Sequence, residues 1–87
     1  MEVAVIVGLN VQRLRRERGI SQEELSFRTS CTRGYLSGIE NGRRNPSLSV
    51  LAVIAKALGT DIQELFAKPE KSRVRAGSSS QKSRKDN

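Results

Sequence analysis

Histidine and tryptophan are absent from this chain of 87 residues, and cysteine occurs once, as Cys31. One thiol cannot form an internal disulfide, and without histidine it cannot complete a zinc site, so we expect neither a metal nor another cofactor. Phosphate-binding loops and nucleophile–base pairs are also missing, which argues against an enzyme. The three aromatic residues are too few for recognition of single-stranded RNA by stacking.

Long apolar runs are missing as well. The stretch from Val3 to Val7 is far shorter than the roughly 20 apolar residues that cross a bilayer, and its flanks are unlike those of a signal peptide. The single cysteine suits a reducing compartment. We therefore expect a cytoplasmic protein without a membrane partner.

The net charge of +7 is unevenly distributed. Residues 68–87 hold seven basic and two acidic residues, whereas residues 1–67 hold nine and seven. The final segment is also rich in serine and has one valine as its only sizeable apolar residue, so it cannot bury enough surface to fold. We predict a folded domain over residues 1–67 and a disordered basic tail over residues 68–87. The tail either adds phosphate contacts or only increases solubility.

Apolar residues recur at helical spacing in the first 67 residues and predict an all-α domain. Val3, Val7, Val11 and Leu14 share one face of a first helix, which Gly19 should end. The β-branched residues near the start would also suit a strand, but no partner strand is evident. A helix is therefore favoured.

Capping residues divide the remaining domain into four short helices. Ser21, Thr32, Ser47 and Asp61 are the expected N-caps, and Glu24 completes a capping box with Ser21. Glycines follow the third and fourth helices and should end them. The residues expected to face inward are Leu25 in the second helix, Leu36 and Ile39 in the third, and Leu51, Ile54, Ala55 and Leu58 in the fourth. The apolar residues of the fifth helix are Ile62, Leu65 and Phe66.

Three segments carry a family resemblance: LRRERGISQEEL, YLSGIENGRRNPSL and IAKALGTDIQELF. In their order and spacing they resemble the lambda-repressor-like helix-turn-helix proteins (the Cro/repressor-type, XRE family), over residues 7–66. The resemblance implies a compact five-helix DNA-binding domain. This chain has Ser30 where the family usually has a glycine in the turn, so we expect a positive φ there. Cys31 replaces an aliphatic residue, and we interpret it as a small apolar residue rather than a redox sensor.

Residues 33–41 form the expected recognition helix, whose outward face would enter the major groove. Arg33 lies in its first turn, where a guanidinium can bind O6 and N7 of guanine. Gly34 and Gly38 lie on the expected outward face of this helix, where each glycine costs roughly 1 kcal/mol of stability relative to alanine. Close approach to DNA would explain them, and an unselected surface is the alternative. The predicted base-contacting residues are Thr32, Arg33, Gly34, Ser37 and Gly38.

Phosphate contacts are predicted on both sides of this helix. Gln22 lies beside the free N–H groups that begin the second helix, and the resemblance implies a phosphate contact for it. Tyr35 either reaches a phosphate or covers the edge of the core. The full predicted set is Gln22, Tyr35, Asn41, Arg43, Arg44 and Asn45. Arg15 and Glu40 match an ion pair of the family that ties the first helix to the third.

These features predict a sequence-specific transcriptional regulator of double-stranded DNA, associated with the nucleoid and without a small-molecule ligand. We expect a homodimer on a two-fold symmetric operator, with half-sites about 34 Å apart. Candidate dimer residues are Ile62, Leu65 and Phe66, with Val5 and Leu9. For Leu65 and Phe66 a wholly internal position is the alternative. One alternative is an antitoxin, whose main activity is binding a protein. Another is a controller of a restriction–modification system, which the segment TRGYLSGIENGRRNPSL also resembles.

Overall fold

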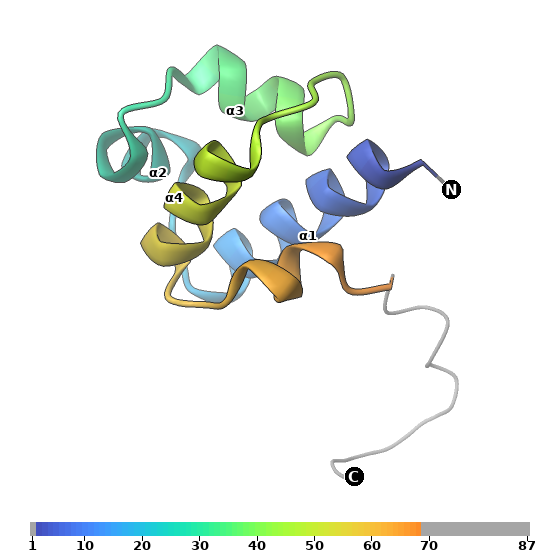
Figure 1. Ribbon diagram of the computed structural model, residues 1–87. Coiled ribbons are helices and arrows are strands. Elements are labelled where there is room, and N and C mark those ends of the chain that lie inside the picture. Colours follow the sequence, from blue (N-terminus) through green and yellow to red (C-terminus); the bar gives the residue numbers. More distant parts are fainter. Residues whose placement is uncertain (1, 69–87) are drawn as a thin grey trace, which may run out of the picture.

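Four α-helices and one short 3₁₀ helix make up the fold (Figure 1). The computed structural model describes residues 2–68, and no strand occurs among them. The helices are α1 (Val3–Glu17), α2 (Gln22–Thr29), α3 (Arg33–Glu40), α4 (Leu48–Leu58) and the 3₁₀ helix η1 (Ile62–Phe66). The predicted all-α class is confirmed, whereas all but one residue of the predicted tail lie outside the described residues.

In Figure 1, α3 runs across the top of the molecule and η1 lies along α1 at the bottom. α1 packs against both α3 and η1, and α4 packs against α2 and η1. This arrangement buries one face of every helix and leaves α3 at the surface. None of these helices is long and apolar enough to span a bilayer.

Hydroxyl groups cap three of the helices as predicted. Ser21 Oγ accepts a hydrogen bond from Glu24 N at 3.0 Å, and Thr32 Oγ1 accepts one from Tyr35 N at 3.0 Å. Ser47 Oγ does the same for α4. The Glu24 carboxylate, however, accepts from Arg28 Nε instead of returning to Ser21. The capping box is therefore only half formed.

The short fifth helix that was predicted is a 3₁₀ helix, and Asp61 is its N-cap residue as expected. Asp61 makes no side-chain capping bond, and the Glu64 N–H donates to the Asp61 carbonyl three residues back. A five-residue segment gains few α-helical bonds for the cost of nucleation, so the tighter winding is favoured. Predicted helix ends were correct elsewhere, because Gly19 and Gly59 follow α1 and α4 closely.

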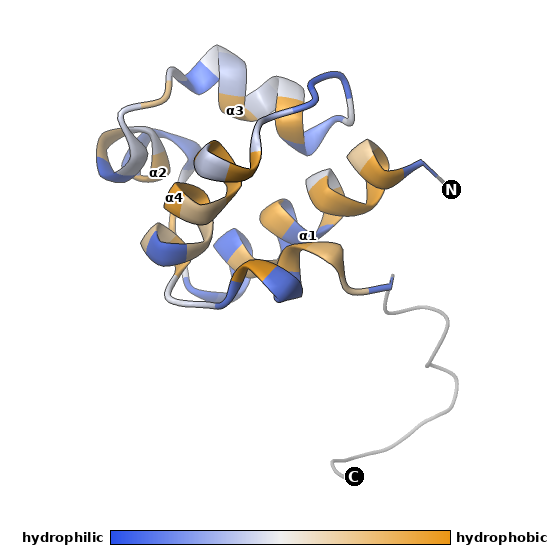
Figure 2. Ribbon diagram, viewed as in Figure 1, coloured by the Kyte–Doolittle hydropathy of each residue, from blue (hydrophilic) through white to orange (hydrophobic). Residues whose placement is uncertain are grey.

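The predicted core faces are confirmed for the three central helices. Leu25 of α2, Leu36 and Ile39 of α3, and the four predicted residues of α4 are all buried. In Figure 2 the hydrophobic residues concentrate in α4 and in the first half of α1, while the loop after α3 is hydrophilic. Val3 was predicted to face inward but is exposed, because it begins α1 beyond the elements that cover the rest of that helix.

Gly8 brings α1 into backbone contact with the end of α3. A Cβ atom at this position would overlap the carbonyl oxygen of Ile39 and lie 2.8 Å from that of Glu40. Any larger side chain would push the two helices apart. A glycine inside a helix otherwise only costs stability, so its role here is the close approach that places α3.

Candidate nucleic-acid interface

The first turn of α3 is the most accessible part of the predicted recognition helix. Thr32, Arg33 and Gly34 are exposed, whereas Ser37 is half-buried. Leu36 and Ile39 face the core, so the outward face is the one that the helical periodicity predicts. The structure therefore presents Arg33 to solvent at the end of α3 where a recognition helix meets base edges.

The two glycines of α3 differ in their surroundings. Nothing lies within 4 Å of the position that a Cβ of Gly34 would take. At Gly38 the same position is 2.9 Å from Arg44 Cγ and 3.1 Å from Arg44 Nε. The sequence predicted bare helix surface at both positions, but in the structure Arg44 covers Gly38.

The loop after α3 carries the polar residues that were predicted to bind phosphates. Asn41, Arg43, Arg44 and Asn45 are all exposed. The Asn41 amide donates to the Ser37 carbonyl at 2.9 Å and so also closes the end of α3. The half-buried ring of Tyr35 packs against the core, and the Arg44 guanidinium carbon lies 5.9 Å from its centroid. Four predicted phosphate-binding residues, Asn41, Arg43, Arg44 and Asn45, are thus gathered at the C-terminal end of α3.

Gln22 begins α2, as predicted, but its side chain is already engaged. Its Nε2 donates to Glu40 Oε1 at 3.2 Å. The same carboxylate is the partner of Arg15, so the start of α2 and the end of α3 are linked through one buried group. A phosphate contact by Gln22 stays a prediction.

Arg15 and Glu40 form the ion pair that the resemblance implied. Arg15 Nε and Nη2 donate to the two carboxylate oxygens at 2.7 and 3.1 Å. The Glu40 side chain is only 2% exposed and that of Arg15 12%. Arg15 also donates from Nη1 to the Ile20 carbonyl at 2.9 Å. Its hydrogen bonds to Glu40 raise the pKa of Arg15 above the usual arginine value, against the opposing effect of burial.

The predicted dimer residues fall into two groups. Leu65 is completely buried within one chain, which is the internal alternative, and its side chain fills the core between α1 and α4 instead of contributing to a dimer surface. Phe66 and Leu9 are 40% and 41% exposed, and Ile62 is half-buried. Val5 is half-buried and lies beside the Gly42 turn. Of the predicted dimer residues, Leu9 and Phe66 are exposed and Ile62 is half-buried, so these three keep accessible apolar surface where α1 and η1 meet.

Sequence reasoning missed Asn10, a buried amide that holds the end of η1. Its Nδ2 donates to the carbonyl oxygens of Leu65 at 2.9 Å and Ala67 at 2.7 Å, and its Oδ1 accepts from Arg13. The available signal was a polar residue three positions after Val7 on the apolar face of the first helix. Such a residue must find partners inside the protein.

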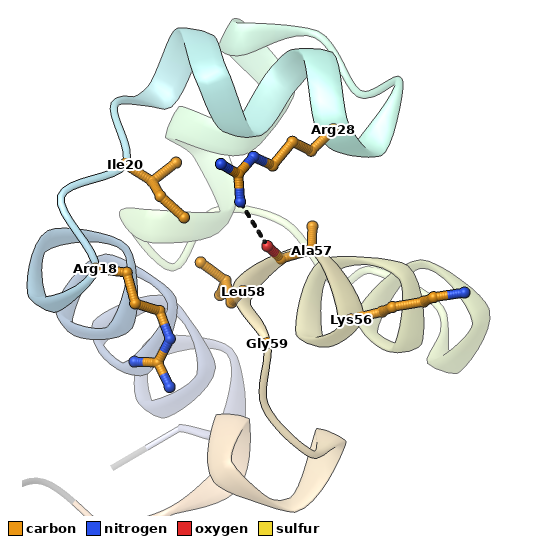
Figure 3. A pocket seen from close by; sticks show the side chains of 7 residues that line it. All are labelled: Arg18, Ile20, Arg28, Lys56, Ala57, Leu58 and Gly59. Atoms are coloured by element: carbon orange, nitrogen blue, oxygen red, sulfur yellow. Dashed lines mark hydrogen bonds between the residues drawn. The ribbon is translucent and has the colours of Figure 1, made fainter.

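A shallow hollow of about 400 Å³ lies where α1, α2 and α4 end (Figure 3). Arg18, Arg28 and Lys56 line it, and Arg28 Nη1 donates to the Ala57 carbonyl at 3.3 Å. Basic side chains at helix C-termini compensate the partial negative charge of the last carbonyl groups. No residue of α3 contributes to this hollow.

Cys31 is half-buried in the turn between α2 and α3 and packs against the core. Its backbone is held by neighbours, since its N–H donates to Thr29 Oγ1 and its carbonyl accepts from Ser26 Oγ. Ser30 adopts the predicted positive φ, at 63°. The turn that sets the angle between α2 and α3 is therefore built as expected.

Comparison with known proteins places these features in a family. The helix-turn-helix family model matches residues 11–65. The uncharacterized HTH-type transcriptional regulator y4dJ of Sinorhizobium fredii is 46% identical over 65 residues, which are 75% of this chain and 84% of that protein.

Solved structures share the fold. The restriction–modification controller protein C.AhdI of Aeromonas hydrophila has a TM-score of 0.70 and 40% identity to this chain. The match covers 72% of this chain and 96% of the C.AhdI chain. The controller C.Esp1396I, solved as a tetramer with its natural 35 base-pair operator, has a TM-score of 0.66 and 28% identity, with coverage of 77% and 99%. This chain belongs to the helix-turn-helix family of DNA-binding transcriptional regulators.

Proposed function

We propose that this protein binds operator DNA as a homodimer, with α3 of each subunit in a major groove. The observation that carries the proposal is the geometry of α3. Its first turn presents Arg33 at the surface, while its other end is held by the buried ion pair between Arg15 and Glu40. A rigid helix with an accessible arginine at its leading end suits direct readout of a guanine.

Phosphates on either side of the groove would fix the position of α3. The start of α2 offers free N–H groups beside Gln22, and the loop after α3 offers Arg43, Arg44 and Asn45. Such contacts carry affinity and orientation but little sequence information. Because Arg33 is the only long side chain on the outward face of α3, we propose that DNA shape supplies part of the specificity. Such a regulator acts at the nucleoid and has no catalytic role.

Sequence selection from random duplexes tests this function. We expect the wild type to select a two-fold symmetric motif, and Arg33→Ala to relax the preference at one base of each half-site. The lost bidentate contact corresponds to about 1–3 kcal/mol of discrimination. Arg18→Ala removes the same charge at the hollow remote from α3 and should keep the motif. Binding without any motif in the wild type would refute sequence-specific recognition.

The dimer surface is proposed at the junction of α1 and η1, around Leu9, Ile62 and Phe66. Phe66→Ala should shift sedimentation equilibrium towards the monomer and weaken operator binding. Phe27 is a matched control, because its ring is 74% exposed but lies on α2. If Phe27→Ala and not Phe66→Ala abolished the dimer, the proposed surface would be wrong.

The likeness to C.AhdI and C.Esp1396I supports a more specific proposal, namely a controller of a restriction–modification system. In that case restriction or methyltransferase genes should lie beside the gene for this protein. A neighbouring small toxin gene would instead favour an antitoxin. Co-purification with the product of the adjacent gene would then be the deciding measurement.

A further inference from the structure

Arg44 folds back from the loop and lies across α3. Its Cγ, Nε and Cδ atoms are 2.9, 3.1 and 3.5 Å from the position that a Cβ of Gly38 would take. Its guanidinium carbon continues to a point 5.9 Å from the centre of the Tyr35 ring. An arginine within about 6 Å of an aromatic ring is attracted to it. The side chain is thus supported along its stem by Gly38 and at its tip by Tyr35.

The backbone after α3 makes this return possible. Gly42 has a φ of 73°, in the left-handed region that favours glycine, and its N–H donates to the Ile39 carbonyl at 3.0 Å. The Arg43 N–H then donates to the Gly38 carbonyl at 2.8 Å. This bond ties the residue before Arg44 directly to Gly38. The chain therefore reverses over the last turn of α3 and delivers Arg44 to the surface of that helix.

We propose that Gly38 is a positioning residue whose missing side chain provides the seat for Arg44. In this arrangement the Arg44 guanidinium is ordered on the DNA-facing side of α3 before DNA binds, ready for a backbone phosphate. This inference rests on the proposed function. It differs from the close-approach explanation for exposed glycines, which needs Gly38 itself to face DNA. Gly34, with open space around it, remains the candidate for close approach.

An alanine at position 38 should displace Arg44 rather than disrupt the fold. The atoms that its Cβ would meet belong to one exposed, flexible side chain, and alanine is the better helix former. Ordering a long side chain on binding costs affinity, so we expect Gly38→Ala to weaken operator binding about 3- to 10-fold for each subunit of the dimer. Because Arg44 is retained, the salt dependence of binding should hardly change.

A double-mutant cycle separates the two explanations. Fluorescence anisotropy with the selected operator would compare wild type, Gly38→Ala, Arg44→Ala and the double variant. We expect Gly38→Ala to have no further effect once Arg44 is removed. A plot of the logarithm of the binding constant against the logarithm of salt concentration has a negative slope. Arg44→Ala alone should make this slope less steep by about 1.8, which corresponds to one lost phosphate contact in each subunit of a dimer. An equal loss from Gly38→Ala in both backgrounds would overturn the proposal, because it would mean direct contact between DNA and residue 38.

Gly34→Ala serves as the matched control on the same helix. It makes the same chemical change and gains the same helix propensity, but its Cβ meets nothing within 4 Å. Whatever its effect on affinity, that effect should be the same with and without Arg44. Coupling between Gly34 and Arg44 as large as that between Gly38 and Arg44 would also count against a specific seat.

Relaxation of the Arg44 ¹⁵Nε signal in the free protein gives a test that needs no DNA. The side chain should be ordered in wild type and in Gly34→Ala, and mobile in Gly38→Ala. Equal mobility in all three proteins would overturn the seat. If the wild type selected no operator while Arg44 showed the expected loss of order, the proposed function would fail and the seat would stand.

Discussion

Removing the Glu40 carboxylate should destabilise the domain severely. The group accepts hydrogen bonds from Arg15 Nε, Arg15 Nη2 and Gln22 Nε2, and it is almost fully buried. Glu40→Ala would leave the Arg15 guanidinium, itself largely buried, without a counter-charge. Breaking a buried pair by removing one partner costs about 3–5 kcal/mol. In a domain of this size each kcal/mol lowers the melting temperature by about 4–8 °C, so a loss of at least about 12 °C is expected.

Thermal and urea denaturation of wild type, Arg15→Ala, Glu40→Ala and the double variant would measure the coupling. We expect about 2 kcal/mol or more, since the bonds are charged and shielded from water. The exposed pair of Glu24 and Arg28, joined at 2.9 Å within α2, is the control and should give about 0.3–0.5 kcal/mol.

A coupling between Arg15 and Glu40 no larger than that of the surface pair would mean that burial does not strengthen this ion pair. The pH dependence offers a second check. The pKa of Arg15 is raised in the folded state. The contribution of Arg15 to folding stability is therefore fully present below the ordinary arginine pKa and is lost only in strong alkali. Arg15 should therefore add no pH dependence to stability in the neutral range.

Three further substitutions test the contacts that place α3 and η1. Gly8→Ala should lower the free energy of unfolding by about 1–3 kcal/mol, because the added Cβ meets backbone oxygen atoms of α3. This cost should outweigh the better helix propensity of alanine. Increased stability in thermal denaturation would contradict this contact. Asn10→Ala should cost about 2–3 kcal/mol by leaving the carbonyls of Leu65 and Ala67 without their buried donor. Hydrogen exchange should then accelerate first in η1, and uniform acceleration would argue against a local clamp. Ser30→Gly should stabilise the protein by roughly 0.5–1 kcal/mol, since it relieves a left-handed conformation; an unchanged urea midpoint would show that Ser30 is not strained.

Much of the fold followed from local signals in the sequence. Hydroxyl residues marked the starts of α2, α3 and α4, and the apolar spacing marked their buried faces. These predictions succeed because capping and amphipathic periodicity depend on residues within one or two turns. At η1 the same pattern located the N-cap residue, Asp61, but its side chain makes no capping bond and the segment is too short for an α-helix.

The features that sequence reasoning missed depend on tertiary contacts that no pattern within one helix reveals. Gly8 and Asn10 meet residues more than thirty and fifty positions away, so no local pattern reveals their partners. Leu65 stayed open between a dimer surface and the core, because periodicity shows that a residue is apolar but not which neighbour covers it. Gly38 was expected to be bare for a related reason, since the return of Arg44 depends on the conformation of the intervening loop.

The anchoring of α3 at one end makes the helix act as a lever. Glu40 and the contact with Gly8 hold its C-terminal end, whereas Arg33 lies seven residues away at the accessible end. At 1.5 Å per residue this arm is about 10 Å long, so a tilt of about 5° at the anchor moves the tip by roughly 1 Å. A shift of that size is enough to spoil a bidentate contact with a guanine. If Arg33 reads a base as proposed, base preference will respond to substitutions in the interior, at residues that never touch DNA.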